Sequence, residues 1–249
     1  KKARAGNAII PKVAFSYAGA IVGAGFTSGQ ELMQFFVNLR SGHIPALILT
    51  TVLFAVFGWA TLHLSRVYRS ADYGSFLKCL LGSRAAQIFD GLISFFLLGT
   101  LGIMLSAAGA VFAERLGWSF QIGVALLCLG IGLVLISRVQ GVFWLNTILM
   151  PAKFILVLIV GGLILLSPGF SLAGSTEAAL LYAEPITQSW YLASLLYVAY
   201  NLILGLAVLT SLGAADLHPK LSWAGIWGGL GLGAFAGIIV AVLVDNWPR

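Results

Sequence analysis

Long apolar segments alternate with short polar ones along the whole chain. Seven of the apolar segments run for roughly 20 residues or more, which is the length that an α-helix needs to cross the hydrocarbon core of a bilayer. They cover residues 12–38, 44–65, 86–113, 119–137, 143–167, 188–213 and 221–244. The pattern predicts an all-α membrane protein, a bundle of about seven transmembrane helices.

A shorter segment between the second and third apolar stretches has a different character. Within residues 71–84, apolar side chains recur at the three- and four-residue spacing of a helix with one apolar face. They are Tyr73, Phe76, Leu77, Leu80 and Leu81. We therefore expect a short helix that lies at the membrane interface.

The composition of the chain argues against a soluble protein. Hydrophobic residues make up 60% of the chain and charged residues 9%, whereas an average soluble domain is about a quarter charged. The net charge of +6 does not form one basic patch, because the basic residues flank the apolar segments. We therefore expect the lipid bilayer, and not a nucleic acid, as a partner of this chain.

The basic residues also predict an orientation. If the N-terminus is inside, eleven of the 14 Lys and Arg residues lie on the inner side, and only Arg40, Arg115 and Arg249 lie on the outer side. Inner loops of membrane proteins carry such an excess. The expected location is the cell inner (plasma) membrane, with several passes and a cytoplasmic N-terminus. The odd number of spans and the absence of an initiator Met lead us to expect a truncated bundle.

The first apolar segment is interrupted by glycines and then by polar residues. Its glycines are Gly19, Gly23, Gly25 and Gly29, and its polar residues include Thr27, Ser28, Gln30 and Glu31. Each glycine weakens a helix by about 1 kcal/mol relative to alanine, so a break is plausible, and freed carbonyls and amides at a break can hold a cation and a carboxylate. Close helix packing also uses glycines four residues apart. Glu31 favours a functional site over close packing, because a carboxylate inside a membrane is costly. The alternative is that Glu31 is solvated near the outer interface.

The sixth apolar segment offers a counterpart in Tyr197, Tyr200, Asn201 and Gly205. Asn201 is expected near the middle of the bilayer, where it either lines a site or makes a hydrogen bond between helices. Polar, glycine-interrupted segments in the first and sixth positions are typical of transporters built from inverted repeats.

Three further polar residues stand within apolar segments. Asp90 either gates an inner pathway or forms a salt bridge at the interface. Ser106 lines a cavity or bonds to its own helix backbone. Lys153 reaches to the interface or, if it is buried, carries a proton.

The seventh apolar segment has a glycine at every fourth position and no polar partner for them. These residues are Gly225, Gly229, Gly233 and Gly237. They predict a packing surface and not a ligand site. The chain also lacks a phosphate loop, a nucleophile elbow and the spacing of metal ligands, so we expect neither an enzyme nor a cofactor.

The stretch IVGAGFTSGQE, residues 21–31, resembles the first helix of the YkvI-like bacterial membrane proteins. These belong to the amino acid–polyamine–organocation transporter group, which has the LeuT-type fold. The resemblance implies two five-helix repeats of opposite topology. Residues 1–168 would form the first repeat, and residues 169–249 would form about two helices of the second.

The same resemblance implies a secondary active transporter of a small polar solute, an amino acid or a related amine. The substrate would lie between a first break at Gly23, Ala24, Gly25, Phe26, Thr27 and Ser28 and a second break flanked by Tyr197, Tyr200, Asn201 and Gly205. Candidates for gating or coupling are Gln30, Glu31, Asp90, Ser106 and Lys153. The coupling ion would be sodium, bound near Gly23, or a proton carried by Lys153. The alternative is a ligand-sensing receptor subunit on the same fold, without net transport.

Overall fold

The computed structural model describes residues 2–23, 26, 29–39, 42–70, 72–166, 186–215 and 219–246, and the regular structure in these ranges is helical. The α-helices are α1 (Lys2–Ile21), α3 (Gln30–Leu32), α4 (His43–Tyr68), α5 (Tyr73–Leu81), α6 (Ser83–Leu116), α7 (Phe120–Ile136), α8 (Arg138–Leu165), α10 (Trp190–Ala215) and α11 (Trp223–Asn246). A π-helix, η1 (Met33–Val37), follows α3, and a 3₁₀-helix, η2 (Pro219–Ser222), precedes α11.

Membrane-spanning helices are present, as the sequence predicts. Within the described ranges, five helical segments are long and apolar enough to cross a bilayer: His43–Tyr68, Ser83–Leu116, Trp144–Ile164, Trp190–Ala214 and Lys220–Val244. The first and fourth predicted spans instead contain the shorter apolar helices Ile9–Ile21 and Phe120–Ile136. The all-helical membrane architecture is therefore confirmed, while the count of seven spans stays a prediction.

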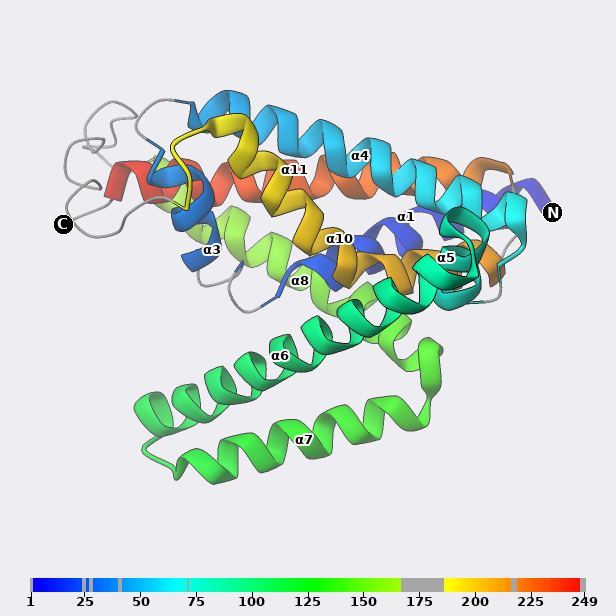
Figure 1. Ribbon diagram of the computed structural model, residues 1–249. Helices are drawn as coiled ribbons and strands as arrows, with labels where there is room; N and C mark the ends of the chain where they lie inside the picture. The colour runs from blue at the N-terminus through cyan, green and yellow to red at the C-terminus, as the bar shows by residue number, and fades with distance from the viewer. Residues whose placement is uncertain are drawn as a thin grey trace.

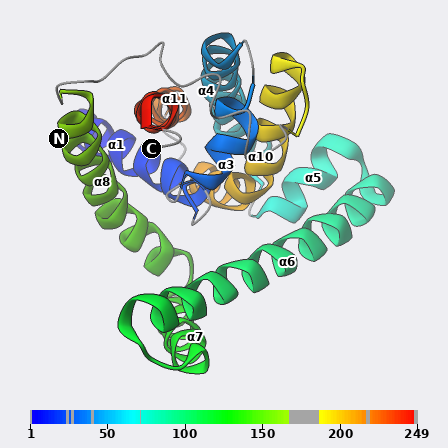
Figure 2. The same ribbon diagram turned by 90° about the vertical axis from the view of Figure 1, so that its left-hand side faces the viewer.

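The main bundle consists of α1, α4, α8, α10 and α11. Helices α8, α10 and α11 pack against α1, and α4 packs against α10 and α11 (Figures 1 and 2). Tyr17 of α1 is fully buried, and its hydroxyl donates a 3.0 Å hydrogen bond to the backbone carbonyl of Phe54 in α4. A tyrosine inside a bundle needs such a partner, because a buried hydroxyl without one is costly.

The predicted glycine surface joins α11 to α4. A Cβ atom added at Gly225 would lie 2.2 Å from the carbonyl carbon of Gly58, and one added at Gly229 would lie 2.3 Å from the amide nitrogen of Ala55. A Cβ at Gly233 would lie 2.0 Å from the hydroxyl oxygen of Thr51, whereas Gly237 has no such neighbour within 4 Å. Three of the four glycines thus let two helices approach closely, as small residues do in membranes.

The amphipathic helix predicted over residues 71–84 is present as α5. Its N-cap is Asp72, whose carboxylate accepts a 2.7 Å hydrogen bond from the backbone amide of Ser75. The Ser75 hydroxyl lies 3.2 Å from the Asp72 amide that donates to it, which completes a capping box. The Ser75 donors lower the pKa of Asp72. Phe76 and Leu77 are buried, whereas Leu80 and Leu81 are exposed, so α5 packs through a part of the predicted apolar face.

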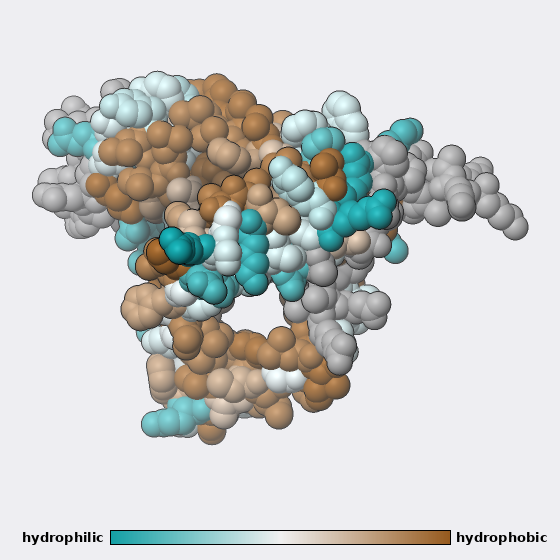
Figure 3. Space-filling model, turned by 45° about the vertical axis from the view of Figure 1, so that its right-hand side comes forward, coloured by the Kyte–Doolittle hydropathy of each residue, from teal (hydrophilic) through white to brown (hydrophobic). Residues whose placement is uncertain are grey.

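Helices α6 and α7 form a hairpin that stands apart from the main bundle (Figure 1). They pack on each other through Gly109, which faces Phe120, and Gly123, which faces Phe112. The space-filling view shows the hairpin as a mostly apolar arm with an opening between it and the bundle (Figure 3). The N-terminal half of α6 packs on the rest of the protein, where Ala86 and Ile93 contact α5 and α10, and Met104 lies close to Gly23 further along the helix.

Candidate functional site

The helix predicted over residues 12–38 is interrupted in its glycine-rich part. Helix α1 ends at Ile21, and the Gly23 amide turns back to donate to the Ile21 carbonyl at 2.8 Å. Gly29 has a φ of 78°, which is a left-handed conformation that glycine adopts readily, and α3 begins after it. Ala24, Gly25, Thr27 and Ser28 lie outside the described residues. Helix α1 thus ends before Gly23 and α3 begins after Gly29, while the predicted break at residues 23–28 stays a prediction.

Packing explains part of the same glycine pattern. A Cβ at Gly19 would lie 2.8 Å from the side chain of Asn146 in α8, and one at Gly23 would lie 3.0 Å from the methyl carbon of Met104 in α6. Gly19 therefore serves close packing, whereas Gly23 both packs on α6 and lies just beyond the end of α1.

Lys153 of α8 reaches the end of α1. Its Nζ atom donates to the backbone carbonyl of Val22 at 3.3 Å, and the side chain is half-buried. The last carbonyls of a helix have no partner within the helix and carry the negative end of its dipole, so they attract a cation. This contact favours the buried alternative for Lys153 over a path to the membrane interface, and its role stays a prediction.

Glu31 is held on the other side of the interruption. It lies in α3, is half-buried, and accepts a hydrogen bond from the Tyr200 hydroxyl in α10. A carboxylate that meets a tyrosine of another helix is not simply a solvated residue at the outer interface. Glu31 thereby links the segment after the interruption to the sixth predicted span.

Two polar atoms of α10 are buried without a hydrogen-bond partner: the hydroxyl of Tyr197 and the side-chain oxygen of Asn201. Both residues are fully buried. The Asn201 amide nitrogen donates to the Tyr197 carbonyl at 2.9 Å, a bond within α10. Among the described residues, Asn201 makes no hydrogen bond to another helix. A buried polar atom without a partner costs about 1–3 kcal/mol, which makes these two atoms candidates for contact with a ligand.

Aromatic rings surround these polar groups. The ring of Tyr197 lies 6.5 Å from Phe26, 5.1 Å from Phe35, 5.0 Å from Phe36 and 5.6 Å from Tyr200, between ring centroids. Phe35 and Phe36 belong to η1 and were not predicted as site residues. The signal in the sequence was the aromatic pair itself, which stands one turn after a carboxylate in an apolar segment. The cluster joins the residues that flank the interruption to α10.

The second break is absent. Helix α10 runs without interruption from Trp190 to Ala215, so Tyr197, Tyr200, Asn201 and Gly205 are ordinary helical positions. Gly205 serves packing: a Cβ there would lie 3.2 Å from the ring of Tyr17. One glycine costs about 1 kcal/mol, which the contacts of a long apolar helix easily offset. The prediction of two breaks fails for this reason, although three of its α10 residues lie at the single interruption.

Three other candidates lie elsewhere or make different contacts. Asp90 accepts a hydrogen bond from the hydroxyl of Tyr73, which joins α5 to α6 at the opposite end of the bundle from α3 (Figure 1). Ser106 is exposed on α6, so it does not line a closed cavity. Gln30 is exposed at the first residue of α3. Among the described candidates, Glu31 and Lys153 remain at the interruption, together with Gly23, Phe26 and the α10 residues.

Within the described residues, no three His, Cys, Asp or Glu side chains form a group that would hold a metal ion. The polar groups at the interruption are one carboxylate, one ammonium, two tyrosine hydroxyls, one amide and the Val22 carbonyl. Such a set suits a small polar molecule by hydrogen bonding better than it suits a transition metal.

The fold and this set of polar groups define a helical membrane protein with buried polar atoms around an interrupted helix. The chain is 33% identical over 202 residues to the "Uncharacterized membrane protein YkvI" of Bacillus subtilis (strain 168), covering 81% of this chain and 56% of the relative. It is 30% identical over 195 residues to the "Uncharacterized protein YyaD" of the same organism, covering 78% and 54%. The chain therefore spans about half the length of these relatives. No family model and no solved structure matches it.

Proposed function

We propose that this chain is part of a secondary transporter that binds a small polar solute, an amino acid or a related amine, at the interruption between α1 and α3. The observation that carries the proposal is the pair of fully buried, unpartnered polar atoms on α10, the Tyr197 hydroxyl and the Asn201 side-chain oxygen. A solute that donates and accepts hydrogen bonds there would remove the cost of leaving them unpaired.

The charges near the interruption favour an amine-bearing solute. Within the part of the chain that the structure describes, the Glu31 carboxylate accepts one hydrogen bond, from the Tyr200 hydroxyl, and carboxylate oxygens accept several bonds. An ammonium group would take the remaining positions. The rings of Phe35 and Tyr200, whose centroids are 5.7 Å apart, would add a cation–π attraction.

Lys153 favours a proton over sodium as the coupling ion. Its ammonium nitrogen already donates to the Val22 carbonyl, next to Gly23 where a sodium ion was expected. Two cations that share one carbonyl at the end of α1 would repel each other strongly in a poorly solvated site. In this proposal, sodium binds only if Lys153 moves away or loses its proton, so exchange of that proton is the simpler form of coupling.

Membership in the amino acid–polyamine–organocation group, with a LeuT-type inverted repeat, is part of the same proposal. Its support is the interrupted first helix, the amphipathic α5 after the second span, and the similarity to YkvI. The continuous α10 does not supply the second break that such a repeat would have.

The test uses the full-length protein in detergent, with thermal stability measured against a panel of amino acids and amines in sodium and in choline at two pH values. A ligand at 100 times its Kd stabilises the folded state by about 2.7 kcal/mol, so a selective rise in the unfolding midpoint is expected. Asn201→Ala and Tyr197→Phe should abolish the rise, and Tyr191→Phe, on an exposed face of α10, should preserve it. A rise of equal size in all three variants would refute the site.

Transport itself needs a second measurement. Accumulation of the identified solute in proteoliposomes, driven by an imposed proton gradient, is expected for the transporter and is lost in Lys153→Met. Binding without accumulation would instead favour the ligand-sensing receptor subunit.

A further inference from the structure

Thr50 of α4 carries a buried hydroxyl without a partner. The residue is 2% exposed, and within the described part of the chain its hydroxyl makes no hydrogen bond. A threonine inside a helix can donate to a carbonyl of its own helix, as the neighbouring Thr51 does to the Leu47 carbonyl at 2.7 Å. Because Thr50 does not, its hydroxyl is buried at a free-energy cost unless a ligand bonds to it.

The carbonyl that Thr50 would ordinarily reach is that of Ala46, one turn before it on α4. The Ser194 hydroxyl of α10 lies 2.9 Å from this carbonyl and 2.9 Å from the Trp190 carbonyl of its own helix. A carbonyl oxygen has two lone pairs, and the backbone amide of the next turn takes one of them. Ser194 thus competes for the other, which leaves the Thr50 hydroxyl available to a ligand.

Helices α4 and α10 run in the same direction along their interface. Ser194 contacts the Ala46 carbonyl near the start of both helices, and the Ser65 hydroxyl donates to the Thr210 carbonyl at 2.8 Å near their ends. Thr50 lies between these two contacts on α4. The adjacent Thr51 instead faces α11, where a Cβ added at Gly233 would lie 2.0 Å from the Thr51 hydroxyl oxygen.

Tyr197 occupies the corresponding turn of α10. It follows Ser194 by three residues, and side chains of a helix lean toward its N-terminus, so the Tyr197 ring leans back toward the level of Thr50. The ring lies 6.0 Å from that of Phe54, one turn after Thr50 on α4. The Tyr197 hydroxyl also has no partner among the described residues. Two unpartnered hydroxyls therefore face the same stretch of the α4–α10 interface.

We propose that Thr50 and Tyr197 bind the carboxylate of the solute, so that the solute is a zwitterionic amino acid and not an amine that lacks a carboxylate. Both hydroxyls can donate, and a carboxylate accepts several such bonds. The ammonium end falls to Glu31, which accepts from Tyr200, and the Tyr200 ring lies 5.6 Å from the Tyr197 ring. This inference rests on the proposed binding at the interruption and names the substrate class that the site selects.

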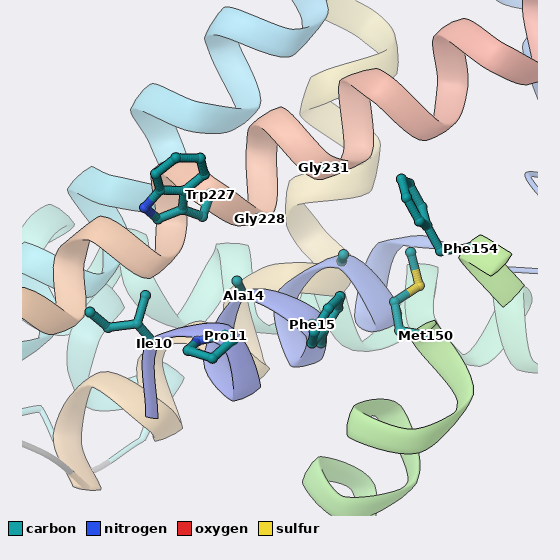
Figure 4. A pocket seen from close by; sticks show the side chains of 10 residues that line it. Ile10, Pro11, Ala14, Phe15, Met150, Phe154, Trp227, Gly228 and Gly231 are labelled. Atoms are coloured by element: carbon teal, nitrogen blue, oxygen red, sulfur yellow. The ribbon is translucent and has the colours of Figure 1, made fainter. Parts of the chain in front are cut away.

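The cavity between α1, α8 and α11 does not suit such a solute. It has a volume of about 420 Å³, and Figure 4 shows its lining. The side chains labelled there, among them Phe15, Met150 and Phe154, are hydrocarbon, aromatic or thioether groups, and the indole nitrogen of Trp227 is the one polar atom among them. A zwitterion in this cavity would leave most of its hydrogen bonds unmade, which is costly.

The test compares amino acids with the amines that lack their carboxylate, on the full-length protein in detergent. The probes are alanine with ethylamine, leucine with isoamylamine, phenylalanine with phenethylamine, and lysine with cadaverine, and the Kd of each is measured by calorimetric titration. We expect the wild type to bind at least one amino acid about tenfold or more tightly than its amine, because hydrogen bonds to a charged group contribute a factor of this size.

Thr50→Val replaces the hydroxyl by a methyl group of similar shape. It should weaken binding of the amino acid about tenfold and leave the Kd of the amine unchanged. Thr51→Val is the matched control, because this hydroxyl already bonds to its own helix, and both affinities should stay as in the wild type. Gly231→Leu, which adds bulk at the lining of the apolar cavity, should also leave both affinities unchanged.

A measurement without ligand separates binding from folding. Thr50→Val should unfold at the same temperature as the wild type or at a higher one, because an apolar group takes the place of a buried hydroxyl without a partner. Loss of the amine together with the amino acid in Thr50→Val, or equal wild-type affinity for every amino acid and its amine, would overturn the carboxylate site and leave solute binding at the interruption standing. Folded wild type that binds none of the probes would overturn both.

Discussion

The main bundle and the α6–α7 hairpin use the same residue types in opposite ways. In the most apolar 18-residue stretch of α4, 33% is buried, and the same share is buried in the span that contains α11. In the corresponding stretch of α6, only 6% is buried. The glycines follow the same division. Gly225 and Gly229 of α11 press against the backbone of α4, but Gly91, Gly99 and Gly102 of α6 have nothing within 4 Å of an added Cβ.

This comparison shows what stabilises a bundle inside a membrane. Lipid tails are as apolar as leucine side chains, so burying apolar surface between helices gives little driving force. Close backbone approach at small residues and hydrogen bonds between helices replace it. The main bundle has both, in its glycine surface and in the hydrogen bond between Tyr17 and Phe54. Most of the described part of the hairpin makes neither a close backbone contact nor a hydrogen bond with the bundle.

The largest expected effect comes from adding bulk to a glycine in each region. Gly229→Leu forces a side chain into the backbone of α4, where a Cβ would lie 2.3 Å from the Ala55 nitrogen, so the free energy of unfolding should fall by about 3 kcal/mol or more. Gly99→Leu, on the open face of α6, should change it by less than about 0.5 kcal/mol. Reversible unfolding in mixed micelles measures both. Equal losses would show that α6 is packed in the native membrane.

A smaller effect is expected from removing a hydroxyl in each region. Tyr17→Phe deletes the buried donor to the Phe54 carbonyl and should cost about 1 kcal/mol. Thr100→Val in α6 deletes a hydroxyl that donates to the Phe96 carbonyl of its own helix at 3.0 Å and, among the described residues, to no other helix, so it should cost almost nothing. The same unfolding assay measures this pair. A larger loss for Thr100→Val would contradict the distinction between the two regions.

The sequence predicts the elements of both regions better than it predicts their contacts. Apolar length locates the helices, and the spacing of Phe76 and Leu77 locates α5, because both signals depend on local residues alone. The interruption near Gly23 is also local. The continuity of α10 is not: whether Asn201 and Gly205 break a helix depends on what surrounds them, and here Asn201 bonds within its own helix while Gly205 meets Tyr17.

The candidate site shows the same limit. Glu31 and Lys153 are visible in the sequence as ionisable residues within apolar segments, which is a strong signal because such residues are costly there. Their partners are not visible. The Val22 carbonyl belongs to no side chain, and Tyr200 is paired with Glu31 across 169 residues of sequence. Ser106 carries the same kind of local signal as Asn201, yet it lies exposed on the hairpin, because only the packing of α6 decides which face is covered.

The smallest expected effect concerns α5, which connects the two regions through its contacts with α6 and α10. Donors from Ser75 hold the Asp72 carboxylate in its charged form, so the pKa of Asp72 is lower in the folded protein than in the unfolded chain. The folded state then binds fewer protons, and the cap stabilises α5 fully above the ordinary pKa of aspartate, about 3.9, and is lost as pH falls below it through the folded value. Because Asp72 lies at the surface, solvent screening keeps the contribution to about 0.5 kcal/mol or less.

Asp72→Asn keeps an oxygen for the Ser75 amide but has no charge to lose, so its stability should not show this acid-dependent step. The difference is measured by unfolding both proteins between pH 6 and the lowest pH at which they remain soluble. It should be about one sixth of the Gly229→Leu effect or less. Identical pH profiles would mean that the charge of the Asp72 cap does not stabilise α5, the helix that contacts both α6 and α10.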